Sequence, residues 1–413
     1  MRSFGARLSL VVAAGLVIRL TYALAVARTI QVGGDAYGFH VLGNLLAAGH
    51  GYIRPFDYVF SGRSLSTAEH PPLYPLYLAL FSKLGATSFA WHRVASCLLG
   101  TATVAAIGLL GRRVGDDRAG LTSAAIAAVY PLLWVIDGSL MSESLYVLLM
   151  VLVALAALRL AERPGTGRAL ALGAVVGLAT LTRGEAIFLI GLLAAPLAWR
   201  ASSRWRSRLR TFALVCAGTA VVMAPWTARN WATFDRPVAV SDNTGTLLTG
   251  ANCFNTYHGR ELGLWRIDCI PPARARNEAV QAALWRDDGL RYARRHAGRL
   301  PVVIAVRVLR TWDLFRPRAQ ASYEVFEGRN RRAEQAGVLS YYVLLVLAIV
   351  GVALLRRRRE VLIVLLAPAV LVTLASVIGY GITRFRAAAE PSIVVLTAIA
   401  IVALADRRQV RRV

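Results

Sequence analysis

The sequence predicts an all-α membrane protein that crosses the bilayer many times, and three observations lead to this fold class. The chain has 413 residues, of which 56% are hydrophobic and 17% are charged, whereas a soluble domain has roughly 25% charged residues. The apolar residues form blocks long enough to cross a bilayer core of about 30 Å. Arginine-rich segments separate these blocks. Together these features exclude a soluble enzyme, a disordered chain and a coiled coil.

The net charge of +25 points to a membrane surface rather than to nucleic acid. Lys83 is the only lysine, and many arginines lie in short clusters between apolar blocks, as at 112–113, 200–210 and 356–359. Arginine-rich short loops are typical of the cytoplasmic side, next to anionic lipid. We therefore expect membrane lipids, and no nucleic acid, as partners.

Counting outward from these clusters predicts about ten spans, beginning inside the cell. The spans are predicted at 8–28, 92–111, 119–136, 140–160, 168–182, 185–199, 209–226, 338–355, 361–378 and 391–405. The first is expected to be an uncleaved span, although Ala25-Val26-Ala27 resembles a signal-peptide cleavage site. A single tilted helix is the alternative for 168–199. It would bury two charges near mid-bilayer, at about 2.5–3.5 kcal/mol each.

Two long polar segments are predicted outside. Residues 29–90 form the first outer loop and contain the apolar stretch 70–81, which at about twelve residues is too short to span and is expected to be an interfacial helix. Residues 227–337 form a larger outer segment, with a second interfacial helix at 301–315. The chain is thus predicted to divide into three regions, 1–226, 227–337 and 338–413.

The four cysteines lack CxxC spacing. Cys97 and Cys216 lie in apolar blocks and are expected to be core residues. Cys253 and Cys269 share one polar loop. Either a disulfide, which an extracytoplasmic loop favours, or two free thiols fits the sequence there.

Polar residues near membrane depth gather at the predicted outer face, and such residues are functional by default. They are Asp35, Glu69, His70, Glu143, Arg183, Glu185, Arg384, Arg386 and Glu390. Asp35 follows Gly33-Gly34 just outside the first span, where a carboxylate could act as a general base. The alternative is that Asp35 is merely the N-cap of a helix.

Structural roles compete with functional ones at the other positions. His70 could end a turn, Glu143 could bridge to Arg183, Glu185 could cap a helix, and Arg386 could anchor to lipid headgroups. The sequence has no HExxH motif, Cys/His metal spacing, P-loop or GxGxxG. A soluble nucleotide-sugar site is therefore unsupported. We expect no cofactor and name no metal ligands, and the sequence leaves metal dependence open.

Several short motifs support a functional interpretation through their order along the chain. In the first loop, Asp35 and Tyr37 precede Gly-His-Gly-Tyr at 49–52 and Glu-His-Pro-Pro-Leu-Tyr-Pro at 69–75. Later motifs are Ser142-Glu143, Thr182–Glu185, Pro225–Asn230, Ser241–Gly245, Gly250–Asn252, Arg384–Arg386 and Glu390-Pro391. This order resembles the GT-C glycosyltransferases, membrane enzymes that use polyprenyl-phosphate sugars and include protein O-mannosyltransferases and lipid A aminoarabinose transferases.

The resemblance covers residues 1 to about 255 closely and the C-terminal end loosely. The chain departs from the family at three positions: Gly184 stands in place of a common proline, Phe385 of a tyrosine and His70 of a lysine. The last departure bears on which cation meets the donor.

The resemblance implies a GT-C fold in the cell (plasma) membrane with the active site facing outside. It also implies an inverting glycosyltransferase that moves a monosaccharide, a hexose or a pentose, from polyprenyl phosphate to a hydroxyl of a protein, glycolipid or cell-wall glycan. In this reaction a base deprotonates the acceptor, and cations stabilise the phosphate leaving group. A transporter or flippase of lipid-linked glycans is the second hypothesis. It would need polar paths in two related halves, whereas the charges cluster at one face.

The candidate residues follow from this chemistry and from the matching motifs. Asp35 is the expected base, and Glu143 is expected to orient the acceptor or to hold an arginine. Arg384, with Arg183 or His70, is expected to bind the donor phosphate, because a guanidinium matches phosphate geometry. The remaining motif residues expected to contact substrate are Tyr37, Glu69 and Asn252.

Overall fold

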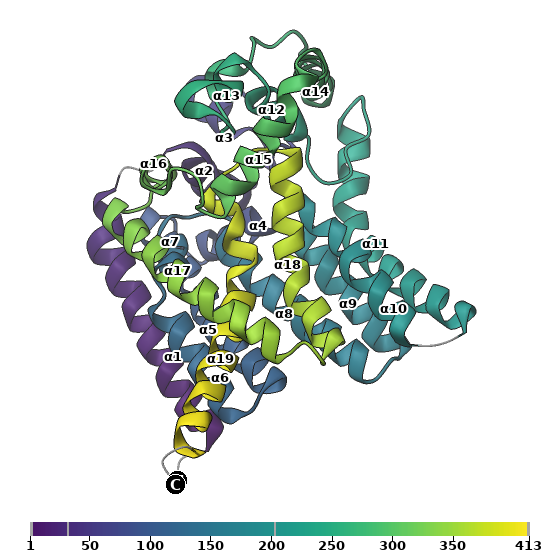
Figure 1. Ribbon diagram of the computed structural model, residues 1–413. Helices are drawn as coiled ribbons and strands as arrows, with labels where there is room; N and C mark the ends of the chain where they lie inside the picture. The colour runs from purple at the N-terminus through teal and green to yellow at the C-terminus, as the bar shows by residue number, and fades with distance from the viewer. Residues whose placement is uncertain (1–2, 31–32, 202–203, 411–413) are drawn as a thin grey trace.

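The computed structural model describes residues 3–30, 33–201 and 204–410, and these ranges are almost entirely helical (Figure 1). Within them no β-strand forms, and one isolated antiparallel bridge joins Ile53 and Ser66. The outermost parts of the first and third predicted regions, residues 1–2 and 411–413, lie outside the described residues. The predicted all-α class is confirmed.

The helices follow one another along the chain with short connections, except in the segment before α14. The α-helices are α1 (Phe4–Thr21), α2 (Gly34–Ala47), α3 (Pro55–Ser61), α4 (Leu73–Lys83), α5 (Phe89–Val114), α6 (Asp117–Val129), α7 (Pro131–Gly138), α8 (Glu143–Glu162), α9 (Thr166–Thr180), α10 (Ala195–Ala201), α11 (Trp205–Thr233), α12 (Thr244–Ala251), α13 (Phe254–Tyr257), α14 (Glu278–Arg295), α15 (Leu300–Thr311), α16 (Pro317–Tyr323), α17 (Arg331–Leu354), α18 (Arg359–Ile378) and α19 (Glu390–Val410). Three 3-10 turns bear on the site, η3 (Gly184–Phe188), η8 (Glu324–Glu327) and η9 (Thr383–Ala388).

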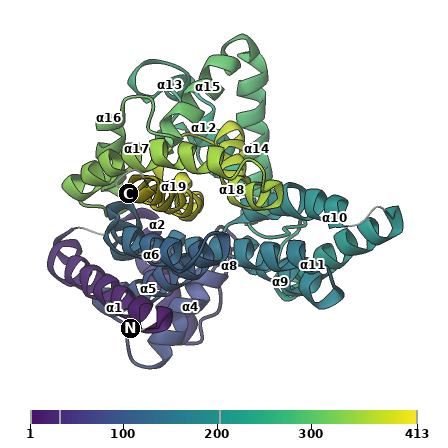
Figure 2. The same ribbon diagram turned by 60° about the horizontal axis from the view of Figure 1, so that its bottom comes forward.

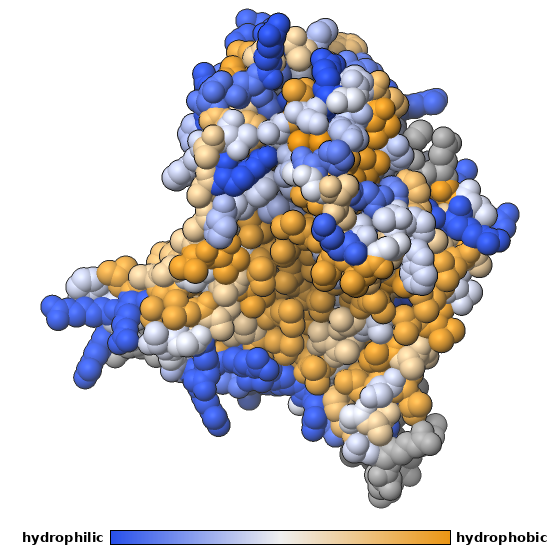
Figure 3. Space-filling view, turned by 180° about the vertical axis from the view of Figure 1, so that it is seen from behind, coloured by the Kyte–Doolittle hydropathy of each residue, from blue (hydrophilic) through white to orange (hydrophobic). Residues whose placement is uncertain are grey.

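Among the described residues, six helices are long and apolar enough to cross a membrane. They are α1 with its extension to Thr29, α5, α8, α11, α17 and α18. The α6 and α7 helices are bent by 50° and qualify together as a seventh. Pro131 accounts for the break, because proline disfavours helical backbone at the residue before it. The protein is thus a multi-pass membrane protein, and Figure 3 shows an apolar belt across its middle with hydrophilic residues above and below.

Three predicted spans are not among those six or seven. The spans predicted at 168–182 and 391–405 coincide with α9 and α19, but the 15-residue α9 is shorter than a typical span. The span predicted at 185–199 is built from η3, a π-helical turn (Ile190–Ala194) and α10. The helices therefore follow the predicted order, while fewer of them satisfy a spanning criterion.

The predicted break between residues 182 and 185 is confirmed. Helix α9 ends at Thr180, and Arg183 has extended backbone at φ −148° and ψ 121°. Arg210 at the start of α11 donates to Thr166 at 3.2 Å, and Arg200 lies 3.2 Å from Glu360. The segment 166–200 therefore starts and finishes at the same end of the bundle, the end that holds these arginines. The alternative of one tilted helix over 168–199 is wrong.

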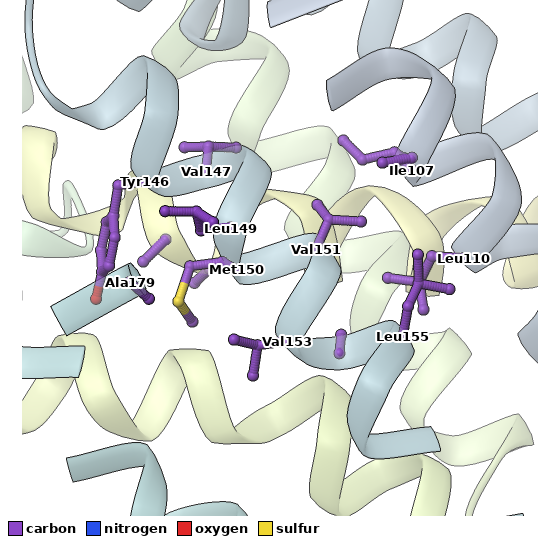
Figure 4. Packing of buried hydrophobic residues seen from close by; sticks show 14 of the residues in the cluster. Ile107, Leu110, Tyr146, Val147, Leu149, Met150, Val151, Val153, Leu155 and Ala179 are labelled. Atoms are coloured by element: carbon purple, nitrogen blue, oxygen red, sulfur yellow. The ribbon is translucent and has the colours of Figure 1, made fainter. Parts of the chain in front are cut away.

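The core of the bundle is built around α8. Its apolar side chains pack between α5 and α9 (Figure 4). Tyr146, Met150 and Val151 are almost completely buried there, alongside Ile107 of α5 and Ala179 of α9. Because α8 carries Glu143 in its first turn, this packing fixes the position of that carboxylate.

Helices α9, α10 and α11 lie to one side of the bundle (Figure 2). Contact between α9 and α11 depends on small residues. A Cβ on Gly173 would lie 2.1 Å from the Val215 carbonyl oxygen, and a Cβ on Gly218 would lie 2.5 Å from that of Leu170. Small residues at such contacts let membrane helices approach closely.

The two ends of the bundle differ in composition. At one end, arginines of the clusters form ion pairs with acidic residues of other segments: Arg113 pairs with Glu162, and Arg118 with Asp406. At the other end, α12, α13 and α14 lie above the bundle (Figure 1), and a disulfide joins Cys253 to Cys269. A helix forms at each of the segments 70–81 and 301–315: α4 and α15 overlap them, and their interfacial position stays a prediction.

Candidate active site

The residues predicted for catalysis and for phosphate binding meet in one group of ion pairs. Arg384 lies at its centre: Nη1 is 3.3 Å from Asp35 Oδ2 and 2.8 Å from Glu327 Oε2, and Nε is 3.0 Å from Glu143 Oε1. Around this centre Arg183 contacts Glu143 and Glu185, each at 2.6 Å, and His70 Nε2 is 3.8 Å from Asp35 Oδ1. We call this group the Arg384 cluster; its members are Asp35, His70, Glu143, Arg183, Glu185, Glu327 and Arg384.

The cluster is assembled from segments far apart in sequence. Asp35 lies in the first turn of α2, and Glu143 begins α8. Arg183 precedes η3, whereas Glu327 ends η8 and Arg384 lies in η9. These segments reach the same end of the bundle because each joins helices, or precedes one, at the end opposite the arginine-rich loops.

The cluster has a buried floor and a more open rim. The Glu143 and Arg384 side chains are 1% and 7% exposed, whereas Asp35 is 37% exposed. Burial raises the pKa of Asp35, but His70 and Arg384 outweigh burial and hold that pKa below its usual value. Glu327 and Glu143 likewise outweigh burial and hold the pKa of Arg384 above its usual value. The site therefore presents an ionised carboxylate beside a charged guanidinium.

The local backbone explains how Asp35 faces the cluster. Gly33 is the N-cap of α2, so Asp35 is not the cap, and the predicted capping alternative is wrong. Gly34 has φ +52°, a left-handed conformation that glycine adopts without strain. This turn directs the chain from the first membrane span into α2.

Two of the structural alternatives also have clear outcomes. The predicted bridge from Glu143 to Arg183 is present, and Glu143 contacts Arg384 as well. Glu185 is not the N-cap of η3, because that position is held by Arg183 and no side chain caps the turn. Glu185 lies within η3 and pairs with Arg183 instead. Glu143 is thus both a structural bridge and part of the cluster.

Two of the predicted substrate contacts lie near the cluster. Tyr37 is two residues from Asp35, and its ring stacks on Phe56 at a centroid distance of 5.8 Å. Glu69 precedes His70, and burial, Glu278 and Asp35 raise the pKa of Glu69 above its usual value. Both residues therefore belong to the first outer loop, which contributes Asp35 and His70 to the cluster.

Asn252 lies apart from the cluster. It ends α12, and its amide donates to the Leu248 carbonyl at 2.7 Å. Its Oδ1 accepts from Tyr257 at 2.8 Å and from Arg307 at 3.0 Å. These contacts hold α12 against α15, and none of them joins Asn252 to the Arg384 cluster.

The expectation that Arg386 anchors to headgroups is wrong. Its side chain is 0% exposed and pairs with Asp313 at 2.7 Å and with Glu390 at 2.6 Å. Tyr130 donates to Glu390 at 3.0 Å, and the guanidinium carbon of Arg386 lies 3.5 Å from the centre of the Tyr341 ring. We call Arg386, Asp313 and Glu390, with these two tyrosines, the Arg386 cluster.

The sequence did not predict the role of Glu327. It lies in the 227–337 segment, where the resemblance fades, yet it makes the 2.8 Å contact to Arg384. Tyr380, two residues after α18, was also missed. Burial raises the pKa of its hydroxyl, which lies close enough to Arg384 and Glu327 for their charges to act on it. The concentration of charges at Glu324, Glu327, Arg329 and Glu334 was the available signal.

The arrangement suits proton transfer beside an anion. Among the described residues, no group of three or more His, Cys, Asp or Glu is arranged to hold a metal ion. An ionised carboxylate can accept a proton, and an adjacent guanidinium can stabilise a phosphate oxyanion.

Comparison with known proteins agrees with this description. Residues 69–228 match the family model described as dolichyl-phosphate-mannose-protein mannosyltransferase. Those residues include His70, Glu143 and Arg183 of the Arg384 cluster. A search of curated proteins finds no match.

Solved structures match over nearly the whole chain. The archaeal oligosaccharyltransferase AglB from Archaeoglobus fulgidus, in complex with an inhibitory peptide and a dolichol-phosphate, has a TM-score of 0.60 at 15% identity, covering 99% of this chain and 51% of that one. The same oligosaccharyltransferase in complex with Zn and sulfate gives 0.59 at 15% identity, covering 97% and 50%. ArnT from Cupriavidus metallidurans bound to undecaprenyl phosphate has a TM-score of 0.42 at 17% identity, covering 96% of this chain and 77% of that one.

The present chain thus spans about half the length of the oligosaccharyltransferases that it matches. The shared part is the helical bundle together with the segment above it. Residues 69–228 are therefore similar to the dolichyl-phosphate-mannose-protein mannosyltransferase family, and the chain as a whole shares its fold with the membrane part of an oligosaccharyltransferase.

Proposed function

We propose that the protein is an inverting glycosyltransferase that moves one sugar from a polyprenyl-phosphate donor to an acceptor hydroxyl. The observation that carries this proposal is the Asp35–Arg384 pair, with 3.3 Å between Oδ2 and Nη1. It sets a proton acceptor next to a phosphate-binding group at one open rim. Family resemblance and fold supply the class of reaction, and the pair supplies the groups that the reaction needs.

The phosphate of the donor binds at Arg384, with Arg183 or His70 as the second cation. A guanidinium binds phosphate oxygens through paired N–H donors. Arg183 shares Glu143 with Arg384, so both cations border one carboxylate. The dolichol-phosphate complex of AglB supports a lipid phosphate as the kind of ligand that this fold accommodates.

The reaction is a single displacement at the anomeric carbon. Asp35 takes the proton of the acceptor hydroxyl as its oxygen bonds to that carbon. The bond between the anomeric carbon and the phosphate oxygen breaks, and the polyprenyl phosphate leaves with the electron pair. Arg384 stabilises the negative charge that develops on the phosphate. Attack from the face opposite the leaving group inverts the anomeric configuration.

The acceptor is a hydroxyl of a glycan, glycolipid or protein outside the cytoplasm, and the sugar is a hexose or a pentose. The active site faces the outside of the plasma membrane. Support for this orientation comes from the arginine clusters, which lie at the end of the bundle away from the Arg384 cluster and are typical of the cytoplasmic side. Residues 227–337 are the part of the chain available to bind the acceptor.

Substitution of Asp35 tests the proposal. Purified wild-type protein should transfer sugar from one of a panel of polyprenyl-phosphate hexoses and pentoses to an envelope glycan or lipid acceptor. Asp35→Asn should lower turnover by about 10²–10⁴-fold, because it removes the base. Asp57→Asn is the matched control, since Asp57 lies in the same loop, is 29% exposed and pairs with Arg63 instead.

The control variant should keep turnover within about two-fold of wild type, as expected for exposed ion pairs. Unimpaired transfer by Asp35→Asn would remove Asp35 from the mechanism. Movement of the lipid-linked sugar across a bilayer without transfer would instead favour the transporter.

A further inference from the structure

We propose that the Glu327 carboxylate competes with the donor phosphate for Arg384, leaves when the donor binds, and returns to expel the polyprenyl phosphate product. This inference rests on the proposed function and assigns to Glu327 control of donor affinity and product release. It concerns a residue that neither the family resemblance nor the motifs of the sequence single out.

The first argument is the atom that Glu327 occupies. Its Oε2 lies 2.8 Å from Nη1 of Arg384, and Asp35 Oδ2 lies 3.3 Å from the same nitrogen. A phosphate oxygen that bonds to this nitrogen beside Asp35 must take the place that the Glu327 carboxylate fills. The planar guanidinium donates its N–H groups to oxygens of either a carboxylate or a phosphate. The two anions therefore compete for the same N–H groups.

The second argument is charge. The Arg384 cluster holds the carboxylates of Asp35, Glu143, Glu185 and Glu327 against the guanidiniums of Arg183 and Arg384. An added phosphate would increase an existing excess of negative charge, and like charges in a partly buried site disfavour one another. Withdrawal of one carboxylate removes this conflict.

The third argument identifies which carboxylate can move. Glu143 is 1% exposed and is held by two arginines at the start of α8. Glu327 is 26% exposed and pairs with one arginine. It ends the four-residue turn η8, and Gly328, which follows, has φ +76°. A glycine next to a short turn lets the backbone rotate there at little steric cost.

The residues on both sides of Glu327 are anchored, so its motion is local. Arg329 contacts Glu324 at 3.1 Å and Glu334 at 3.2 Å, and all three side chains are at most 2% exposed. Glu324 also accepts a hydrogen bond from the Arg384 backbone N–H at 3.2 Å. Glu327 can thus move only locally, because its neighbours in the chain are held in place, and it stays close to Arg384.

The chemistry of the product makes the return of Glu327 useful. The donor is a phosphodiester with one negative charge, whereas the polyprenyl phosphate product is a monoester that carries close to two charges near neutral pH. The product would therefore bind Arg384 more tightly than the donor. A tethered carboxylate that competes for Nη1 offsets this difference and shortens the residence of the product.

The experiment measures binding of undecaprenyl phosphate to the full chain in detergent micelles by titration, for wild type and Glu327→Gln. Loss of a charge-assisted competitor should tighten binding about 5- to 50-fold. With the transfer assay, Glu327→Gln should match or exceed the single-turnover rate of wild type and lower the steady-state rate, because product leaves more slowly. A residue with a structural role alone would weaken binding when it is replaced.

Glu261→Gln is the matched control. Glu261 is also 26% exposed and pairs with Arg266 at 2.8 Å, away from the Arg384 cluster. The affinity of Glu261→Gln for undecaprenyl phosphate should therefore stay within about two-fold of wild type. Thermal unfolding verifies the fold of each variant, and Glu327→Ala replaces Glu327→Gln if the amide destabilises the turn.

The outcomes separate the two proposals. No binding of undecaprenyl phosphate by wild type would overturn the proposed function and this inference with it. Binding by wild type that Arg384→Ala weakens, but that neither Glu327→Gln nor Glu327→Ala tightens, would overturn only the role of Glu327.

Discussion

Arg384 and Arg386 are two residues apart in η9, yet they belong to very different environments. Arg386 is completely buried, and its partners Asp313 and Glu390 are at most 2% exposed. Arg384 shares its guanidinium among three carboxylates, of which Asp35 and Glu327 are 37% and 26% exposed. The short turn thus places one arginine in a closed cluster and the other at an open rim.

The difference in exposure agrees with the proposal that the Arg384 cluster binds ligand while the Arg386 cluster is structural. Further protein groups close the Arg386 cluster: Thr383 donates to Asp313 at 2.8 Å, and Tyr130 donates to Glu390 at 3.0 Å. Such a cluster holds the end of α15 and the starts of η9 and α19 together. The Arg384 cluster has two partly exposed carboxylates, Asp35 and Glu327, which is what the proposed exchange of partners requires.

The largest effect is expected for removal of the closed arginine. Arg386→Ala leaves Asp313 and Glu390 buried without their cation, which typically costs about 3–5 kcal/mol of unfolding free energy. Thermal unfolding in detergent measures this loss. Arg112→Ala is the control, since Arg112 also has a 2.6 Å ion pair but is 50% exposed, and it should cost at most about 1 kcal/mol. Equal stability of the two variants would remove the distinction between closed and open clusters.

A smaller but functional effect is expected for the open arginine. Arg384→Ala should lower turnover about 10²–10³-fold, because one stabilising donor to the phosphate is lost. Its unfolding temperature should stay closer to wild type than that of Arg386→Ala, since the rim carboxylates become hydrated. Steady-state transfer and thermal unfolding on the same preparations compare the two. A collapse of stability with Arg384→Ala would mean that both clusters are structural.

The smallest effect concerns a third polar group, formed by His40 of α2 and His92 of α5. His40 is 8% exposed, and its Nδ1 lies 3.1 Å from Nδ1 of His92. Burial and the neighbouring histidine lower the pKa of His40 to about 4. The unfolded chain, with a histidine pKa near 6.5, binds more protons between these values, so stability should be complete above about pH 6.5 and fall by about 1–3 kcal/mol as the pH drops to 4.

Unfolding temperatures of wild type and His40→Gln between pH 7 and pH 4 check this expectation. The variant should lose less stability over this range than wild type, because one titrating group is removed. Parallel curves for the two proteins would show that His40 does not carry the pH dependence.

Much of the open cluster could be predicted from the sequence because membrane topology constrains it. Asp35, Glu143, Arg183 and Arg384 each lie where an apolar block ends, and alternation of the arginine clusters puts those ends on one side. The break at Arg183 was predictable for the same reason, since a charge at mid-bilayer is costly. The resemblance carried by the order of the motifs implied the GT-C fold, and the predicted spans agreed with it.

The rest depended on tertiary packing that leaves no pattern in the sequence. The Glu327 contact with Arg384 joins residues 57 apart, one in the polar segment before α17 and the other after α18. Arg386 resembled a headgroup anchor because its partner Asp313 is separated from it in sequence by three α-helices, α16, α17 and α18. Asn252 matched a motif, yet its position against Arg307 is set by the packing of α12 on α15. Helix order could thus be inferred, whereas side-chain partners between distant loops could not.

The most direct test of the central claim is the position of bound polyprenyl phosphate in an experimentally determined structure of the complex. The account predicts a phosphate oxygen within hydrogen-bonding distance of the Arg384 guanidinium, with the Asp35 carboxylate facing the same space. A headgroup bound elsewhere, with the Arg384 cluster unchanged, would contradict it.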